Sequence, residues 1–224
     1  VSGFWRRGGR AAIVAVAALA GAASSGAAQS NRLPAPAEVP TPVGRSLPPI
    51  PLPAVDDLEA AVASQIRGES QRVSALATRA RVGARDLADA YGALGQVLHV
   101  YEFFEPAELS YANAIRLAPG AAKWPHLLGY LYQQTGRLND AVEQFTAARR
   151  IQPTDQAATV RLGDVYLDLN RLREAREEFE SVREIFPALA QKGLGEVAIR
   201  ERRFGDGPAA APRRPRATSP SRSV

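Results

Sequence analysis

The chain has 224 residues, a formal net charge of +5 at pH 7 and no cysteine. Without cysteine there are no disulfides, no thiolate metal ligands and no cysteine nucleophile. The positive charge lies at the two ends, because residues 29–201 hold 19 basic and 22 acidic residues, so it does not indicate nucleic-acid binding by the folded part.

Residues 1–28 have the pattern of an export signal. A basic segment with three arginines precedes an apolar run over residues 11–23, and small residues form a cleavage site before Gln29. The alternative is an uncleaved membrane anchor, but the alanine-rich run is short for spanning a bilayer. We therefore expect an exported protein, periplasmic or secreted, that uses general secretion rather than the twin-arginine route.

Residues 29–53 are rich in proline. Because proline lacks a backbone N–H and favours polyproline geometry, we expect a semi-rigid linker that holds the following domain away from its point of attachment. A ligand for a proline-binding domain is the alternative.

Residues 54–82 carry apolar side chains at roughly helical spacing, and Asp56 and Asp57 stand where an N-cap and first-turn acids belong. We expect an amphipathic helix that caps the apolar face of the segment after it. A coiled-coil dimerisation arm is the alternative, but its alanine-rich seam is thin.

From residue 88 onward, one register of residues recurs at a spacing of 34. The recurring sets are Leu94-Gly95, Leu128-Gly129 and Leu162-Gly163; Ala107, Ala141 and Ala175; Tyr111, Phe145 and Phe179; and Pro119, Pro153 and Pro187. This pattern resembles the tetratricopeptide repeat family, of the exported bacterial type, over about residues 88–206. The resemblance implies an all-α fold, a right-handed α-solenoid of three helical hairpins with a preceding helix and a partial fourth repeat.

The three repeats are expected at residues 88–121, 122–155 and 156–189, each with a helix A followed by a helix B. The glycine of each Leu-Gly pair lets helix A approach helix B closely, and the alanine supplies a matching small surface. The aromatic residues fill the space between hairpins, and the prolines end helix B. The tryptophan that is frequent early in helix A of the family is replaced here by other residues.

A fourth repeat begins and stays incomplete. Leu194-Gly195 restores the pair and Arg203-Phe204 resembles the earlier hairpin turns, so one helix A is expected within residues 190–207. Pro208 follows where helix B should start. This end is either a natural cap or a truncated array. Residues 208–224 are expected to form a disordered basic tail, with adhesion to an anionic envelope surface as its alternative role.

No motif indicates catalysis or a bound cofactor. The chain has no nucleophile elbow, glycine-rich phosphate loop, metal-binding His-Glu pair or haem-attachment motif. Its two histidines, His99 and His126, are expected about 10 Å apart along the solenoid axis, too far to share a metal ion. We therefore expect no catalytic residue, no metal site, no cofactor and no enzymatic activity.

The family resemblance also implies a groove on the concave face, lined by helix A positions that do not pack against helix B. The expected partner-binding residues are Asp89, Gln96, His99, Lys123, His126, Tyr130, Gln133, Gln134, Arg161, Asp164 and Asp168. This set is polar and mixed in charge, with one aromatic anchor, which suits an extended peptide or a helix of a partner. The family's clamp for chaperone-tail carboxylates is not expected, because Gly92 and Gln96 replace its lysine and asparagine, although Arg161 matches.

The expected function is a non-catalytic protein–protein interaction scaffold exported to the cell envelope. It would bind a peptide or partner protein in this groove and assist assembly of a larger complex. The alternative is a structural oligomerisation module, in which the exposed face of the terminal repeat pairs with another copy of the chain.

Overall fold

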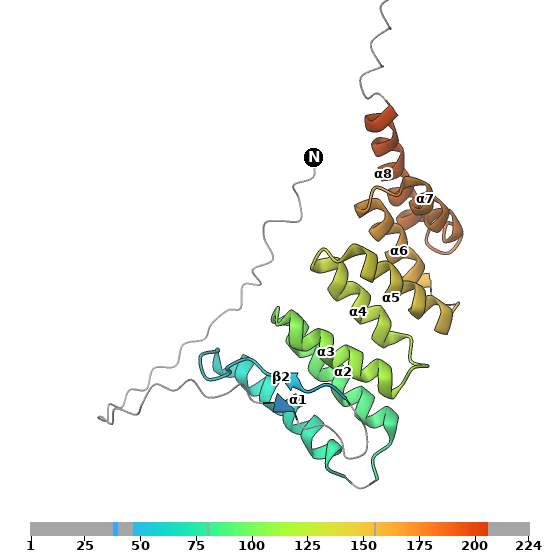
Figure 1. Ribbon diagram of the computed structural model, residues 1–224. Coiled ribbons are helices and arrows are strands. Elements are labelled where there is room, and N and C mark those ends of the chain that lie inside the picture. Colours follow the sequence, from blue (N-terminus) through green and yellow to red (C-terminus); the bar gives the residue numbers. More distant parts are fainter. Residues whose placement is uncertain (1–37, 40–46, 80, 155, 206–224) are drawn as a thin grey trace, which may run out of the picture. The chain divides into compact units, whose positions relative to one another are not determined.

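The computed structural model describes residues 38–39, 47–79, 81–154 and 156–205 (Figure 1). The expected signal peptide, most of the proline-rich linker and the basic tail lie outside these residues. The helices are α1 (Ala60–Ala77), α2 (Ala84–Val100), α3 (Phe104–Leu117), α4 (Lys123–Gln134), α5 (Leu138–Ile151), α6 (Gln156–Asp168), α7 (Leu172–Ser181) and α8 (Pro187–Gly205). Two short strands, β1 (Glu38–Val39) and β2 (Ile50–Pro51), pair antiparallel, with Val39 opposite Ile50.

The expected all-α repeat architecture is confirmed. Helices α2 and α3, α4 and α5, and α6 and α7 form three antiparallel hairpins (Figure 1), and the second helix of each hairpin also packs on the first helix of the next unit. Each unit therefore buries its apolar face against its sequence neighbours, as in other helical repeat proteins.

The recurring glycines are points of close contact within the hairpins. A Cβ atom added at Gly95 would lie 2.8 Å from the ring of Tyr111, one at Gly129 would lie 3.0 Å from Phe145, and one at Gly163 would lie 2.7 Å from Phe179. The aromatic side chain of helix B therefore rests directly on the glycine of helix A in every repeat. A larger residue at the glycine would push the two helices apart.

The hairpin turn is also repeated, although its residue types are not. Glu102, Gly136 and Asn170, spaced by 34, all have positive φ, at 63°, 77° and 57°. The residue after each one donates its backbone N–H back into the preceding helix, as from Arg137 to the Tyr132 carbonyl at 2.8 Å. This left-handed residue ends helix A and reverses the chain, and glutamate adopts it at a higher energetic cost than glycine.

Several helix ends differ from the sequence-based expectation. Helix α1 begins at Ala60, so Asp56 and Asp57 precede it rather than cap it, and Asp56 instead forms an ion pair with Arg67 at 2.6 Å. Helix α2 begins at Ala84, four residues before the expected start of the first repeat. Pro187 does not end the third repeat but opens α8, where its fixed φ suits the first turn of a helix.

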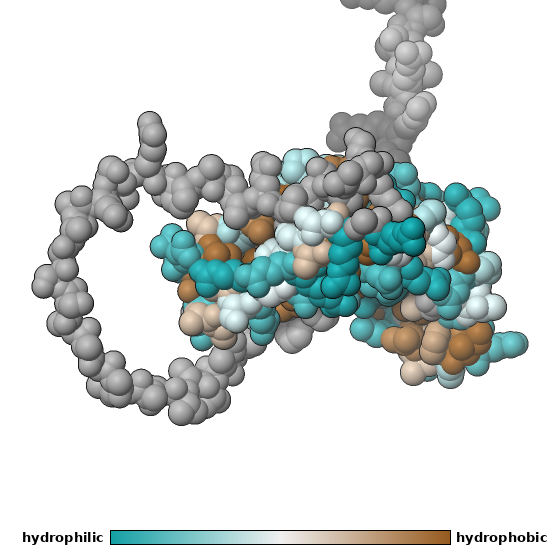
Figure 2. Space-filling view, turned by 90° about the horizontal axis from the view of Figure 1, so that it is seen from below, coloured by the Kyte–Doolittle hydropathy of each residue, from teal (hydrophilic) through white to brown (hydrophobic). Residues whose placement is uncertain are grey.

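Helix α1 covers the first hairpin. Its buried residues, Ala63, Ile66, Val73 and Ala77, recur at helical spacing, and the helix packs against α2. Figure 2 views the molecule from below Figure 1, toward the end that holds α1, and many of the residues there are hydrophilic. An apolar inner stripe with a polar outer face is the composition expected of a helix that ends a repeat array.

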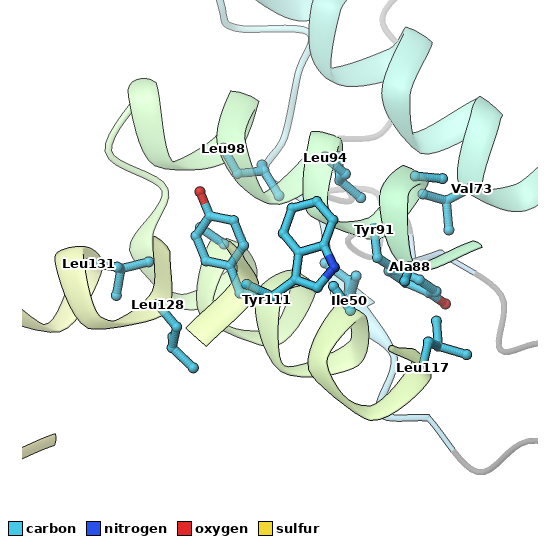
Figure 3. Packing of buried hydrophobic residues seen from close by; sticks show 14 of the residues in the cluster. Ile50, Val73, Ala88, Tyr91, Leu94, Leu98, Tyr111, Leu117, Leu128 and Leu131 are labelled. Carbon is cyan, nitrogen blue, oxygen red and sulfur yellow. The ribbon is translucent and has the colours of Figure 1, made fainter. Parts of the chain in front are cut away.

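The end of the proline-rich segment is not a free spacer, which corrects the expectation for residues 47–53. Leu47, Ile50 and Leu52 are buried, and the Asn113 side-chain amide of α3 donates a hydrogen bond of 2.9 Å to the Pro48 carbonyl. Ile50 belongs to the same apolar cluster as Val73 of α1 and Tyr91 of α2 (Figure 3). We call residues 47–53 the strap, because they run across the first hairpin as part of its core.

The expected fourth repeat consists of one helix, α8, which packs on α7 and α6. It continues through Arg203 to Gly205, so the hairpin turn expected at Arg203-Phe204 is not formed. Among the described residues, no neighbour outside its own helix lies within 4 Å of a Cβ built at Gly195, whereas the matching glycines of the three hairpins are covered. Ile199 is 51 % exposed on this helix. If two copies of the chain pair through the terminal repeat, this exposed face of α8 is where they would meet. That pairing stays a prediction.

Among the residues that the structure describes, no helix is both long and apolar enough to span a bilayer.

Candidate binding surface

The helix A residues expected to line the groove come together from separate repeats. Lys123 Nζ of α4 lies 2.8 Å from Asp89 Oδ1 of α2, and Gln133 Nε2 of α4 donates to Asp168 Oδ2 of α6 at 3.2 Å. Side chains about one repeat apart therefore meet across neighbouring A helices. We call this surface the A-helix face and define it by Asp89, Gln96, Lys123, His126, Tyr130, Gln133, Gln134, Arg161, Asp164 and Asp168.

His99 does not belong to this surface, which corrects the sequence-based assignment. It is only 9 % exposed. Its Nε2 lies 2.5 Å from Gln134 Oε1 and its Nδ1 lies 3.4 Å from the Tyr111 hydroxyl. Because an amide oxygen only accepts, Nε2 carries the proton and Nδ1 accepts from the hydroxyl in the neutral ring. His99 thus joins the first repeat to the second instead of facing a partner.

Tyr130 is held by residues of all three repeats. The His99 ring lies 5.7 Å from it, the Arg161 guanidinium lies 5.1 Å from its centroid, and Gln134 Nε2 donates to its hydroxyl at 3.4 Å. A cation over an aromatic face contributes about 0.5–1 kcal/mol at an exposed site. The expected aromatic anchor therefore has a structural role, and only its remaining surface is open to a ligand.

Asp164 is the acid of this face whose pKa departs from its ordinary value. Burial raises its pKa, while Arg161 and Lys192 oppose that rise and Asp168 adds to it. Arg161 Nη1 lies 3.8 Å from Asp164 Oδ2. Lys192 comes from α8, so a charge of the fourth helix A also acts on this surface. No groove residue was expected on α8, because the sequence indicates only an incomplete unit there.

A pocket of about 390 Å³ lies beside these residues. It is lined by Gln96, Lys123, Trp124, His126, Leu127, Gln152 and Ala157. Three of these, Gln96, Lys123 and His126, were expected from the sequence. Gln152 and the three apolar residues were not, because only polar helix A positions were expected to face a partner. The register held a usable signal, since Ala157 occupies the same repeat position as Asp89 and Lys123.

An aromatic and a basic side chain lie side by side in the lining of this pocket. Lys123 Nζ lies 4.2 Å from the centre of the Trp124 ring, and the Trp124 side chain is buried with no hydrogen-bond partner for its Nε1 among the described residues. A second pocket, of about 420 Å³, lies between α1 and α2 and is lined mainly by Arg72, Arg79, Asp86 and Asp89. The pocket of about 420 Å³ suits the binding of polar groups, whereas the pocket of about 390 Å³ combines polar side chains with the apolar Trp124, Leu127 and Ala157.

Within the described part of the chain, histidines and carboxylates form no group of three that could hold a metal ion. The ion pairs on the outer helices are short-range surface pairs, such as Arg173 with Glu177 at 3.1 Å. Such pairs contribute at most about 1 kcal/mol each and carry no chemistry of their own.

Comparison with known proteins agrees with this geometry. Residues 132–194 match the family model described as tetratricopeptide repeat. No curated protein is significantly similar to the chain. Among solved structures, the Arabidopsis OM64 TPR domain has a TM-score of 0.50 at 18% identity, covering 53% of this chain and 99% of that one.

Two further solved structures are similar at a lower score. The Sgt2 TPR domain from Aspergillus fumigatus has a TM-score of 0.49 at 20% identity, covering 61% of this chain and 87% of that one. The first TPR of Spaghetti (RPAP3), bound to an HSP90 peptide, has a TM-score of 0.49 at 19% identity, covering 51% and 93%. The 34-residue register, the three hairpins built on it and the family match over residues 132–194 together show that the chain contains tetratricopeptide repeats.

Proposed function

We propose that this protein is a non-catalytic protein–protein interaction scaffold that holds a peptide, or a segment of a partner protein, on the A-helix face. The observation that carries the proposal is the assembly of polar side chains from α2, α4 and α6 into one surface beside a pocket of about 390 Å³. Such a surface offers many hydrogen-bonding groups on a rigid helical frame, which is what recognition of a peptide needs.

The pocket on this face gives the proposal a direct test. Ala157 is exposed at the pocket wall, so Ala157→Trp should fill the pocket without disturbing the core. We expect it to reduce recovery of the partner from the native cell envelope at least about tenfold, the effect of losing one interface hot spot. Recovery is measured by affinity capture of the tagged full chain and quantitative mass spectrometry.

The matched control is Ala61→Trp, which places the same side chain at an exposed position of α1. Far-UV circular dichroism should be unchanged for both variants. Equal recovery of the same proteins by Ala157→Trp and by the unaltered chain would exclude the A-helix face as the binding surface.

We also propose that the protein acts outside the cytoplasm, in the periplasm or as a secreted protein. The support is the sequence of residues 1–28, with its basic segment, apolar run and small-residue cleavage site. Expression in the native host should give a mature chain that begins at Gln29, as measured by N-terminal sequencing. A chain recovered with the apolar run intact in the membrane fraction would instead support the anchor.

A further inference from the structure

The charged groups of the A-helix face are balanced by one another. Asp89 pairs with Lys123 at 2.8 Å, and Arg161 lies 3.8 Å from Asp164. Lys192 is close enough to Asp164 to oppose the rise of its pKa, and Asp168 accepts a hydrogen bond from Gln133. When Lys192 is counted with the face, its three carboxylates are matched by three basic side chains, so the net charge of these groups is zero.

Because these charges are paired, the surface produces only a weak electrostatic field, which would do little to favour a ligand of either charge. A charged group that bound Asp89 or Lys123 would have to displace the existing partner, so the gain from a new ion pair would be offset by the loss of the old one. Opposite charges a few ångströms apart also cancel at longer range, which weakens electrostatic steering of a partner.

Side-chain amides are further polar groups of the surface. Gln96 is exposed and lines the pocket with Gln152. The Gln134 amide is already bonded to His99 and Tyr130, and the Gln133 amide donates to Asp168. A glutamine side chain both donates and accepts hydrogen bonds, as the peptide main chain does. An extended segment offers its main-chain N–H and C=O groups to such amides, whereas a helix has already paired nearly all of its own.

The pocket adds an apolar contact to this polar surface. Leu127 and Ala157 line it together with the Trp124 ring. Its volume of about 390 Å³ is large enough for a side chain of a bound segment.

From these observations we propose that the A-helix face binds an extended peptide without net charge, held through its main chain by the Gln96 and Gln152 amides and by one apolar side chain in the pocket. This inference rests on the proposed function and names the partner chemistry of the same surface. Charge selectivity is suppressed by the internal pairing, so breaking one pair should create it.

A peptide display library of random segments of about twelve residues is the probe, selected on the full chain and followed by synthesis of the enriched peptides. For the unaltered protein we expect enriched peptides with a mean net charge near zero. Their Kd should change less than about twofold between about 0.05 and 0.5 M NaCl, since no exposed ion pair forms on binding.

Lys123→Ala is the decisive variant, because it leaves Asp89 without its partner. Selection on this variant should shift toward peptides rich in lysine and arginine, and their Kd should rise about tenfold over the same salt range. Arg150→Ala is the matched control, since Arg150 is exposed on α5 and belongs neither to this face nor to the lining of the pocket, and its selected peptides should resemble those of the unaltered protein.

The outcomes separate this inference from the function on which it rests. Enrichment of charged, salt-sensitive peptides by the unaltered protein would overturn the inference and leave the scaffold function standing. Unshifted selection by Lys123→Ala would also overturn it. Failure to enrich any peptide would reject binding of a peptide on this face and the inference together.

Discussion

Replacing Phe145 by alanine is expected to lower the free energy of unfolding by about 3–5 kcal/mol. The Phe145 ring is fully buried in α5, lies against Gly129 of α4 and meets the edge of the His126 ring at 5.4 Å between centroids. Its removal leaves a cavity at the centre of the middle hairpin, which both neighbouring repeats contact. Urea denaturation of the full chain, followed by far-UV circular dichroism, measures the change.

A second substitution tests whether the glycine and the ring act as a pair. Gly129→Ala alone should crowd the ring, because its Cβ would lie 3.0 Å from Phe145, whereas in the Phe145→Ala background the added methyl group enters empty space. The two changes should therefore be less damaging together than the sum of their separate effects. Thr146→Ala, a half-buried neighbour on α5, is the control, with an expected loss below about 1 kcal/mol. A comparably small loss in Phe145→Ala would contradict the central position of the ring.

The hairpins could be predicted from the sequence because their packing residues occur in complementary pairs. A glycine in helix A and an aromatic residue in helix B are useful only if the two helices touch there, so their joint recurrence identifies the contact. The hairpin turn shows the limit of that method. Its left-handed positions hold glutamate, glycine and asparagine. Because three different residue types adopt the same backbone conformation, no residue type recurs at this position of the sequence.

The binding surface was predicted less well than the fold, for a physical reason. Polar character at a helix A position indicates exposure, but a polar side chain with hydrogen-bond partners can also be buried. His99 shows this, since its equivalent one repeat later is Gln133 and two repeats later is the buried Leu167. That register position therefore lies at the boundary between surface and core. Of the two ion pairs of the face, Arg161 with Asp164 is a local pair within α6, whereas Asp89 and Lys123 lie a repeat apart in the sequence and no local pattern joins them.

The proline-rich segment was misjudged at one end because composition was given more weight than spacing. Eight prolines indicate an extended chain, and the strap is indeed extended, with Ile50 and Pro51 forming β2. An extended chain can nevertheless dock. Leu47, Ile50 and Leu52 recur every two or three residues within the strap, which allows one side of it to face an apolar surface. That spacing was the available signal.

Replacing Ile50 by alanine tests whether the strap is part of the folded core. Ile50 is completely buried, and its cluster includes Val73, Tyr91 and Leu117 from α1, α2 and α3 (Figure 3). We expect Ile50→Ala to lower the free energy of unfolding of the full chain by about 2–5 kcal/mol, measured by urea denaturation. A spacer would make no such contribution, because its side chains would be solvated before and after unfolding.

Pro49→Ala is the matched control, since Pro49 is exposed within the same strap, and its expected effect is below about 1 kcal/mol.

Asn113→Ala removes the hydrogen bond from α3 to the Pro48 carbonyl and should cost about 1–3 kcal/mol, because that carbonyl would lose its partner. If Ile50→Ala and Pro49→Ala gave equally small losses, the strap would be an undocked linker. If Ile50→Ala is the more damaging, the folded unit includes the strap, which begins 47 residues before the first recurring Leu-Gly pair. The folded unit of a repeat protein then begins with the segments that cover the apolar surface of its first hairpin, and not with the first copy of the repeat.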